Sequence, residues 1–398
     1  MSHKRLLVLL SLLALLVFPL SGALAQGGPP IFCGDLNEAD CAILTQAQAA
    51  MADLHSAAFD LTLDFTFAGG EEIMPGMDEL AVTLLANGAF AADMEAIAGF
   101  QSPDPEALAE MMRAMPEALG TFLRSLEGEV NLQVVLPAEL MASLPAELPD
   151  GLVFDFVMVD GVWYINLEAI APLMAAEAEA QPQMPTWIGL DLAGMMEQIM
   201  EEAGGAWEAQ MENMEQILQS DLFTFMYDPA FLGQFMTVTR LEDAEVAGQT
   251  MAVFQTTLDY GALFASDDFQ NAFMDYMETW MALQGESMEE LPENFGEIMA
   301  AMMSGMSFQT VEWIGLADFY THHTAMDFAF ALDFEELAAL VPEAEADELP
   351  ANLSMTMSLV VDASAFNEPV EVAAPEGAQV INPLMFMGAE MGQPSGSK

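Results

Sequence analysis

Residue types that commonly carry out catalysis are sparse in this chain. His322 and His323 are adjacent, and neighbouring side chains on a strand point to opposite faces, so the two imidazoles cannot act together on one metal. The sequence contains no Gly-x-Ser-x-Gly, no phosphate-binding Gly-rich loop and no His-Glu-x-x-His. No catalytic residues are therefore predicted, and a protein that is not an enzyme is expected.

Methionine offers a second kind of chemistry, because soft thioethers bind Cu(I). Met-x-x-Met spacing occurs at Met74–Met77, Met112–Met115, Met211–Met214 and Met303–Met306. The chain contains 34 methionines, so this spacing arises from composition alone, and the His clusters that accompany copper sites are absent. Copper binding is the weaker hypothesis, and no metal or other cofactor is predicted.

Carboxylates dominate the charge of the chain. There are 63 Asp and Glu against 6 Lys and Arg, which gives a formal net charge of −57 at pH 7. Such a chain repels nucleic acid and anionic membrane surfaces, so neither is an expected partner. Asp35–Asp40 has acids at roughly alternating positions but lacks the central Gly and the final Glu of a calcium loop, which favours a helix cap. A solvated acidic coat and a divalent-cation requirement for full stability both remain open.

Export signals occupy the N-terminus. Lys4 and Arg5 precede an apolar run over 6–20, and Ala23-Leu24-Ala25 forms a small-x-small cleavage site before Gln26. We predict that 1–25 is a signal peptide and that the mature protein is secreted, periplasmic or in the cell envelope, without stable membrane insertion. In an oxidising compartment Cys33 and Cys41, eight residues apart, are expected to form a disulfide.

Period-two alternation of apolar and polar residues predicts antiparallel strands with one apolar face. The alternating runs are 59–67, 80–90, 130–136, 152–158, 163–167, 237–242, 252–260, 326–334 and 353–361. Asp160-Gly161 lies between two of these runs and is a strong hairpin signal, and Val246-Ala247-Gly248-Gln249 is a predicted turn. About nine or ten antiparallel strands are expected from these runs.

Apolar residues at three- and four-residue spacing predict helices. One follows a cap at Asp35 or Asn37 and runs to Leu54, and two Met-rich helical blocks are expected at about 169–235 and 262–306. Strands interrupted by such blocks predict one α+β domain, a curved antiparallel sheet with the Met-rich helices on its concave face.

Four short stretches carry a resemblance to a known family. They are Val159–Ile165, Glu245–Phe254, Trp313–Asp318 with the strand after it, and the Asn-Glu-Pro-Val ending Phe366–Pro375. In their order along the chain they resemble the LolA-like superfamily, the half-barrel carriers that include LolA, LolB and the mycobacterial LppX/LprG group. The resemblance implies an open half-barrel domain over 57–381, after a disulfide loop and N-terminal helix at 26–56 and before a flexible tail at 382–398. It also implies an apolar cavity for acyl chains, lipoproteins or glycolipids.

The cavity lining is expected from the apolar faces of the strands and the Met-rich helices, since the unbranched thioether of Met re-packs around variable shapes. The expected lining residues are Phe59, Leu61, Leu63, Phe65, Phe154, Phe156, Met195, Met196, Ile199, Met200, Trp207, Phe328, Phe330, Leu332, Met355 and Met357. The alternative is that the same residues fill a dry core.

Two functions follow, from different classes. The first is an exported carrier or chaperone for a lipid, a lipoprotein or another hydrophobic ligand. Because Lys and Arg are nearly absent, neutral lipids or lipid-modified peptides are favoured over ligands with anionic head groups. The second is an acidic envelope or surface protein that makes protein contacts, with divalent cations as bridges.

Overall fold

The structure, a computed structural model, describes residues 31–69, 79–94, 114, 117–138, 152–168, 171, 185–198, 222, 225, 228–284, 294–333, 339–340 and 352–381. The predicted signal peptide (1–25), the predicted tail (382–398) and most of the predicted helical block at 169–235 lie outside the described residues.

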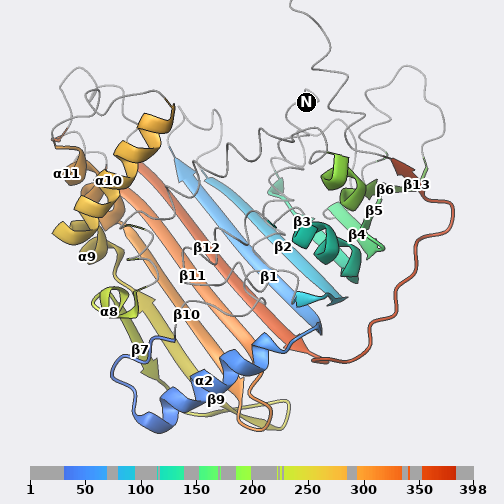
Figure 1. Cartoon of the computed structure of the whole chain (residues 1–398), viewed down its shortest axis with the longest axis horizontal. Coiled ribbons are helices and arrows are strands. Elements are labelled where there is room, and N and C mark those ends of the chain that lie inside the picture. The colour runs from blue at the N-terminus through green and yellow to red at the C-terminus, as the bar shows by residue number, and fades with distance from the viewer. Residues whose placement is uncertain are drawn as a thin grey trace, which may run out of the picture.

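One large sheet organises the fold (Figure 1). Its thirteen strands are β1 (Ser56–Gly69), β2 (Glu79–Ala91), β3 (Glu127–Val135), β4 (Leu152–Val159), β5 (Val162–Asn166), β6 (Trp187–Asp191), β7 (Met236–Arg240), β8 (Ala244–Val246), β9 (Gln249–Leu258), β10 (Met306–Gly315), β11 (Thr321–Asp333), β12 (Asn352–Ser364) and β13 (Gln379–Ile381). The order across the sheet is β13-β6-β5-β4-β3-β2-β1-β12-β11-β10-β9-β7, and β8 pairs with β9 off this path. Neighbouring strands are antiparallel except for β13 and β6. The first and the penultimate strand therefore meet at the centre of the sheet.

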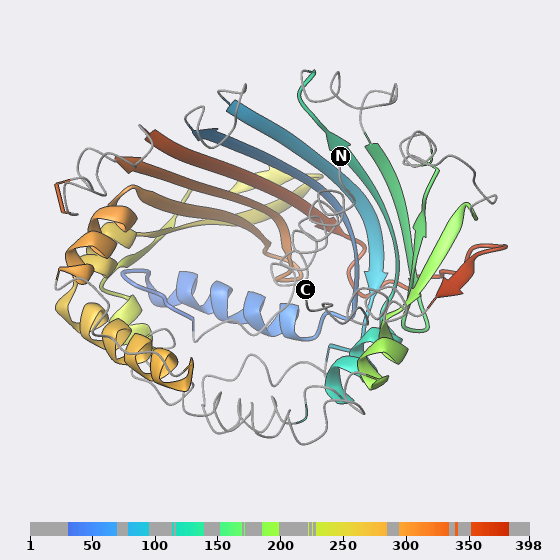
Figure 2. The same ribbon diagram turned by 90° about the horizontal axis from the view of Figure 1, so that it is seen from above.

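The sheet is curved and open, and it bends around the helix α2 (Glu38–Ala52), as Figure 2 shows. Its two faces differ because the strand registers place residues of one kind opposite each other. Leu61 pairs with Val361 and with Ala86 on the apolar face, whereas Asp60 pairs with Asp362 on the other face. The apolar face packs against α2 and is therefore the concave one.

Helix α2 begins at an Asx cap. The side-chain oxygen of Asn37 accepts hydrogen bonds from the backbone N–H groups of Ala39 and Asp40, at 3.0 and 3.1 Å, which satisfies two donors that the first turn leaves unpaired. The predicted disulfide is confirmed, because Cys33 and Cys41 are bonded with their Cα atoms 5.4 Å apart. It ties the preceding segment to the first turn of α2.

One margin of the sheet carries four of the described helices. They are α8 (Pro229–Leu232), α9 (Tyr260–Ala265), α10 (Asp267–Gln284) and α11 (Phe295–Ser304). Phe231, Leu263 and Phe269 form a buried cluster between α8, α9 and α10, and stacked or edge-to-face ring pairs such as Phe264–Phe269, with centroids 4.7 Å apart, hold these short helices together.

Several sequence-based expectations need correction. The sheet has thirteen strands rather than nine or ten, because β8 and β13 have only three residues each and strands so short show no alternation. Strand β6 lies inside the block that was expected to be helical. Met306, expected to end the helical block at 262–306, begins strand β10.

The longer expected strands and turns agree with the structure. Strands β1 and β2 pair over their length. Asp160 and Gly161 have φ values of 55° and 78°, and Ala247 and Gly248 have 51° and 83°. Two consecutive positive φ values are what a tight two-residue hairpin turn requires.

Candidate functional site

Eight Phe and Met side chains form two rows across four central strands of the concave face. The first row joins Phe65, Met357, Phe328 and Phe308 as cross-strand partners, and the second joins Phe67, Met355, Phe330 and Met306. These eight residues are called the Phe/Met lattice below. Each of them is only partly buried, although directly opposed residues on one face of a sheet lie close enough to cover part of each other.

Helix α11 covers one margin of the lattice. Ile298 and Met302 of α11 pack against the buried Leu332, as does Phe330 of the lattice. The predicted lining residues Phe65, Phe328, Phe330, Leu332, Met355 and Met357 therefore lie in one region of β1, β12 and β11. Phe67, Phe308 and Met306 complete this region and were absent from the sequence-based set.

A second group of predicted lining residues lies in the adjacent part of the concave face. Leu61, Leu63 and Phe154 are buried in one hydrophobic cluster, against which Phe59 and Phe156 pack. Partners of this cluster include Leu84, Leu132 and Leu359. Leu61, Leu63 and Phe154 are packed core and are less exposed than the lattice, whereas Phe59 and Phe156 are partly buried.

The predicted helical residues are placed only in part. Met195 and Met196 are partly buried in a helical stretch, 192–198, that follows β6. This stretch lies at the opposite side of the sheet from β10 (Figure 1), so the two Met side chains are distant from the lattice. Ile199, Met200 and Trp207 lie outside the described residues.

Four polar side chains interrupt the concave face directly beside the lattice. Glu312 pairs with Phe254 on β9 and with Thr324 on β11, and Thr310 pairs with Thr256. Glu312, Thr310, Thr324 and Thr256 are called the polar patch below. The other acids of β10 and β11, Asp327 and Asp333, fall at alternate positions that belong to the polar face.

Burial raises the pKa of the Glu312 carboxyl above its ordinary value. The cause is desolvation by burial, which disfavours the charged form of the carboxyl. Within the described part of the chain no hydrogen bond to this carboxyl is found that would offset the cost. The sequence did not predict the patch. Glu312 and Thr310 on β10 and Thr256 on β9 are polar residues at positions where the alternation of a concave face requires apolar ones.

Arg240 lies one strand further along the same row. Its guanidinium stands 5.0 Å from the centroid of the Phe254 ring, and Phe254 separates it from Glu312 in the strand order. Arg240 already pairs with Asp243, and its Nε lies 3.4 Å from Asp40 of α2. The positive charge of Arg240 is therefore matched by carboxylates other than Glu312.

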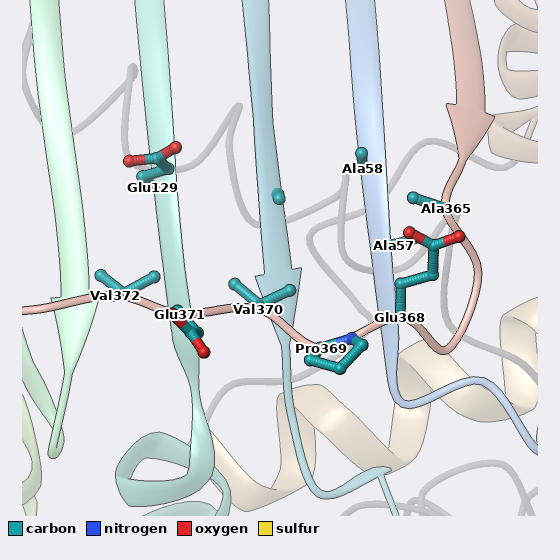
Figure 3. A pocket seen from close by; sticks show the side chains of 10 residues that line it. Ala57, Ala58, Glu129, Ala365, Glu368, Pro369, Val370, Glu371 and Val372 are labelled. Carbon is teal, nitrogen blue, oxygen red and sulfur yellow. The ribbon is translucent and has the colours of Figure 1, made fainter.

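Two hollows are found in the part of the chain that the structure describes, and the larger one includes Met306, Phe308, Phe328 and Met357 of the lattice. The larger, about 630 Å³, is lined mostly by polar-face residues such as Asp64, Asp327 and Ser358, with Phe328 and Met357 also contributing. The smaller, about 200 Å³, lies where the segment 365–378, called the strap below, crosses the ends of β1, β2 and β3 (Figure 3). Polar walls make the larger hollow a poor place for an apolar ligand.

The two adjacent histidines act separately, as the sequence predicts. The Nε2 atom of His322 lies 3.0 Å from a carboxylate oxygen of Asp318, while the Nδ1 atom of His323 lies 2.6 Å from Asp362. Among the described residues no group of three or more His, Cys, Asp or Glu is arranged to hold a metal ion. No described helix has the length and apolar character needed to cross a membrane.

No family model and no curated protein matches this sequence. Among solved structures, the chain is similar to LprF from Mycobacterium bovis, with 10% identity and a TM-score of 0.29 over 88% of this chain and 100% of that one. It is similar to the lipoprotein LppX from Mycobacterium tuberculosis, with 9% identity and a TM-score of 0.24 over 85% of this chain and 100% of that one.

A putative outer membrane lipoprotein-sorting protein domain from Vibrio parahaemolyticus also matches, with 8% identity and a TM-score of 0.18 over 83% of this chain and 93% of that one. TM-scores this low do not identify a ligand or a mechanism for this chain. The chain is thus similar to structures of the LppX and lipoprotein-sorting kind, the group that its sequence motifs resemble.

Proposed function

We propose that this protein is an exported, non-catalytic binding protein that carries a lipid or another hydrophobic ligand against the concave face of its sheet. The Phe/Met lattice is the binding surface, and the Met-rich helices at the margin close over the ligand. Lipoproteins are included as ligands through their acyl chains. The predicted signal peptide and the Cys33–Cys41 disulfide support export.

The observation that carries this proposal is the exposure of the lattice. A sheet face that packs against a completed core buries its apolar side chains, as Leu61 and Leu63 do on β1 at 5% and 6% exposure. Phe65 and Phe67, further along the same strand and on the same face, remain partly exposed. The lattice is thus a contiguous apolar surface that stays partly accessible, and accessible apolar patches can mark binding sites in soluble proteins.

The composition of the lattice supports an adaptable ligand. Five of its residues are Phe, which offer large rigid rings, and three are Met, whose flexible thioethers re-pack around chains of different shape. Aliphatic chains lack directional groups, so a surface that recognises them needs area and plasticity more than hydrogen bonds.

A fluorescent apolar probe, N-phenylnaphthylamine, tests this proposal. Saturable binding to the wild-type protein is expected, and Met357→Asn should weaken it at least fivefold because the amide places a polar group in the lattice. Thr356→Asn is the matched control, since this neighbouring residue belongs to the polar face and is exposed, and its affinity should equal that of wild type. Absence of saturable binding, or equal loss in both variants, would leave the acidic surface protein as the better hypothesis.

A further inference from the structure

We propose that the polar patch anchors the hydroxyl group of an uncharged acyl ligand whose chain lies on the Phe/Met lattice. This inference rests on the proposed function and narrows its ligand to a class: long-chain alcohols, monoacylglycerols and lipids of similar amphiphilic form. The polar patch then determines specificity, while the lattice supplies most of the affinity.

The geometry of β10 places the patch and the lattice in line. Met306, Phe308, Thr310 and Glu312 follow one another on the same face. Phe308 and Glu312 are four residues apart, about 13 Å along a strand. A chain lying parallel to β10 on Met306 and Phe308 would therefore bring its terminal group to Thr310 and Glu312.

The patch offers both partners that a hydroxyl needs. The three Thr side chains can each donate and accept, and the carboxyl of Glu312 accepts in either protonation state. Among the described residues these four side chains have no hydrogen bond to another residue, so their donors and acceptors are available to a ligand hydroxyl.

An anionic head group fits the patch poorly. A ligand carboxylate placed beside Glu312 would have to lose its hydration shell, and it would be repelled whenever Glu312 is ionised. Arg240, which could offset this repulsion, already pairs with Asp243 and lies behind the Phe254 ring. An ammonium head group also fits less well than a hydroxyl. Desolvation favours the uncharged form of Glu312, which offers an ammonium ion no opposite charge. Moving the ammonium ion from water to the polar patch has a desolvation cost of its own.

Displacement of N-phenylnaphthylamine by dodecane, dodecanol, dodecanoate and dodecylamine at pH 8 tests this inference. Dodecanol is expected to bind about tenfold more tightly than dodecane, the effect of one or two net hydrogen bonds. Dodecanoate should bind more weakly than dodecanol. Glu312→Leu and Thr310→Val should each reduce the preference for dodecanol over dodecane, and Asp327→Asn, on the polar face of β11, should leave it unchanged.

The outcomes separate this inference from the proposed function. If none of the four probes binds, the proposed function itself fails. If dodecane and dodecanol bind equally well, or if dodecanoate or dodecylamine binds more tightly than dodecanol, the lattice binds chains but the patch does not select a hydroxyl. Glu312→Gln keeps the shape and the hydrogen-bonding capacity of the side chain. If this variant retains the preference for dodecanol over dodecane and Glu312→Leu loses it, misfolding is excluded as the cause.

Discussion

Asn367 donates a hydrogen bond from its side-chain amide to the phenol oxygen of Tyr320, 2.8 Å away. The same amide lies 3.3 Å from the backbone oxygen of Asp53, and its oxygen accepts from the backbone N–H of His55 at 2.8 Å. Asn367 thereby joins the start of the strap, the end of α2 and the β10–β11 turn. The Asn-Glu-Pro-Val ending seen in the sequence therefore has a structural role. The three side-chain hydrogen bonds of Asn367, called the Asn367 clamp below, hold together elements that border the concave face.

Replacing Asn367 should destabilise the fold. Its φ of 58° lies in the left-handed region that Asn and Gly tolerate best, so Asn367→Gly removes the side-chain bonds alone, whereas Asn367→Ala adds backbone strain. We expect a loss of about 1–2 kcal/mol for Gly and about 1 kcal/mol more for Ala, measured by urea unfolding. Glu371→Gln, an exposed strap residue, should have no effect. Equal stability of Asn367→Ala and wild type would contradict the Asn367 clamp.

Loss of the disulfide should loosen the N-terminal end of α2. A loop closed over eight residues stabilises by about 2.5 kcal/mol in the chain-entropy account. The double variant Cys33→Ser with Cys41→Ser should unfold at a lower urea concentration than the oxidised wild-type protein. Dithiothreitol should lower the urea midpoint of the wild-type protein and leave that of the variant unchanged. A variant as stable as the oxidised wild-type protein would show that packing of Ile43, Leu44 and Ala47 on the sheet fixes α2 unaided.

Glu312→Gln should stabilise the protein at neutral pH and have little effect in acid. The folded-state pKa of Glu312 is raised above its ordinary value of 4.5, so the stability linked to this group is full below the unfolded pKa and is lost as pH rises through the folded one. The neighbouring elements carry two charged pairs, Arg240 with Asp40 and His322 with Asp318. Both pairs are unchanged in the variant, so they do not contribute to the difference in stability. A melting temperature higher by a few degrees at pH 8 but not at pH 4 is expected; the same difference at both pH values would mean that packing, not charge, is responsible.

Asp60 and Asp362 face each other on β1 and β12, and like charges directly opposed on a sheet are destabilising. Asp60→Asn should therefore raise stability by about 0.5 kcal/mol. Because exposed charges are screened by salt, the gain measured by thermal unfolding should shrink at high ionic strength. A gain that persists in high salt would mean that charge repulsion is not its cause, and a loss of stability would mean that the Asp60 carboxylate has a stabilising partner.

Sequence reasoning succeeded where a strand is long and has one apolar face. The alternation over 59–67 and 353–361 predicts β1 and β12, and the strong conformational demand at Asp160-Gly161 predicts the β4–β5 turn. The disulfide followed from two cysteines close together in a chain that is predicted to be exported. In each case a local signal was sufficient.

The remaining features depend on contacts between distant segments. Strand β13 pairs with β6 only because the strap carries it across the sheet, and three residues show no periodicity by themselves. The polar patch could not be predicted either: Glu312 and Thr310 look like polar-face residues until the pairing with Phe254 and Thr256 shows that they share the concave face. The lattice likewise depends on a register that alternation alone does not specify.

Extraction of the protein purified without detergent, followed by mass spectrometry of the organic phase, tests the central claim most directly. The account predicts co-purifying molecules with aliphatic chains at near-stoichiometric amounts, and a clear reduction in Met357→Asn but not in Thr356→Asn. An organic phase free of such molecules, from protein that also fails to bind added dodecanol, would contradict it.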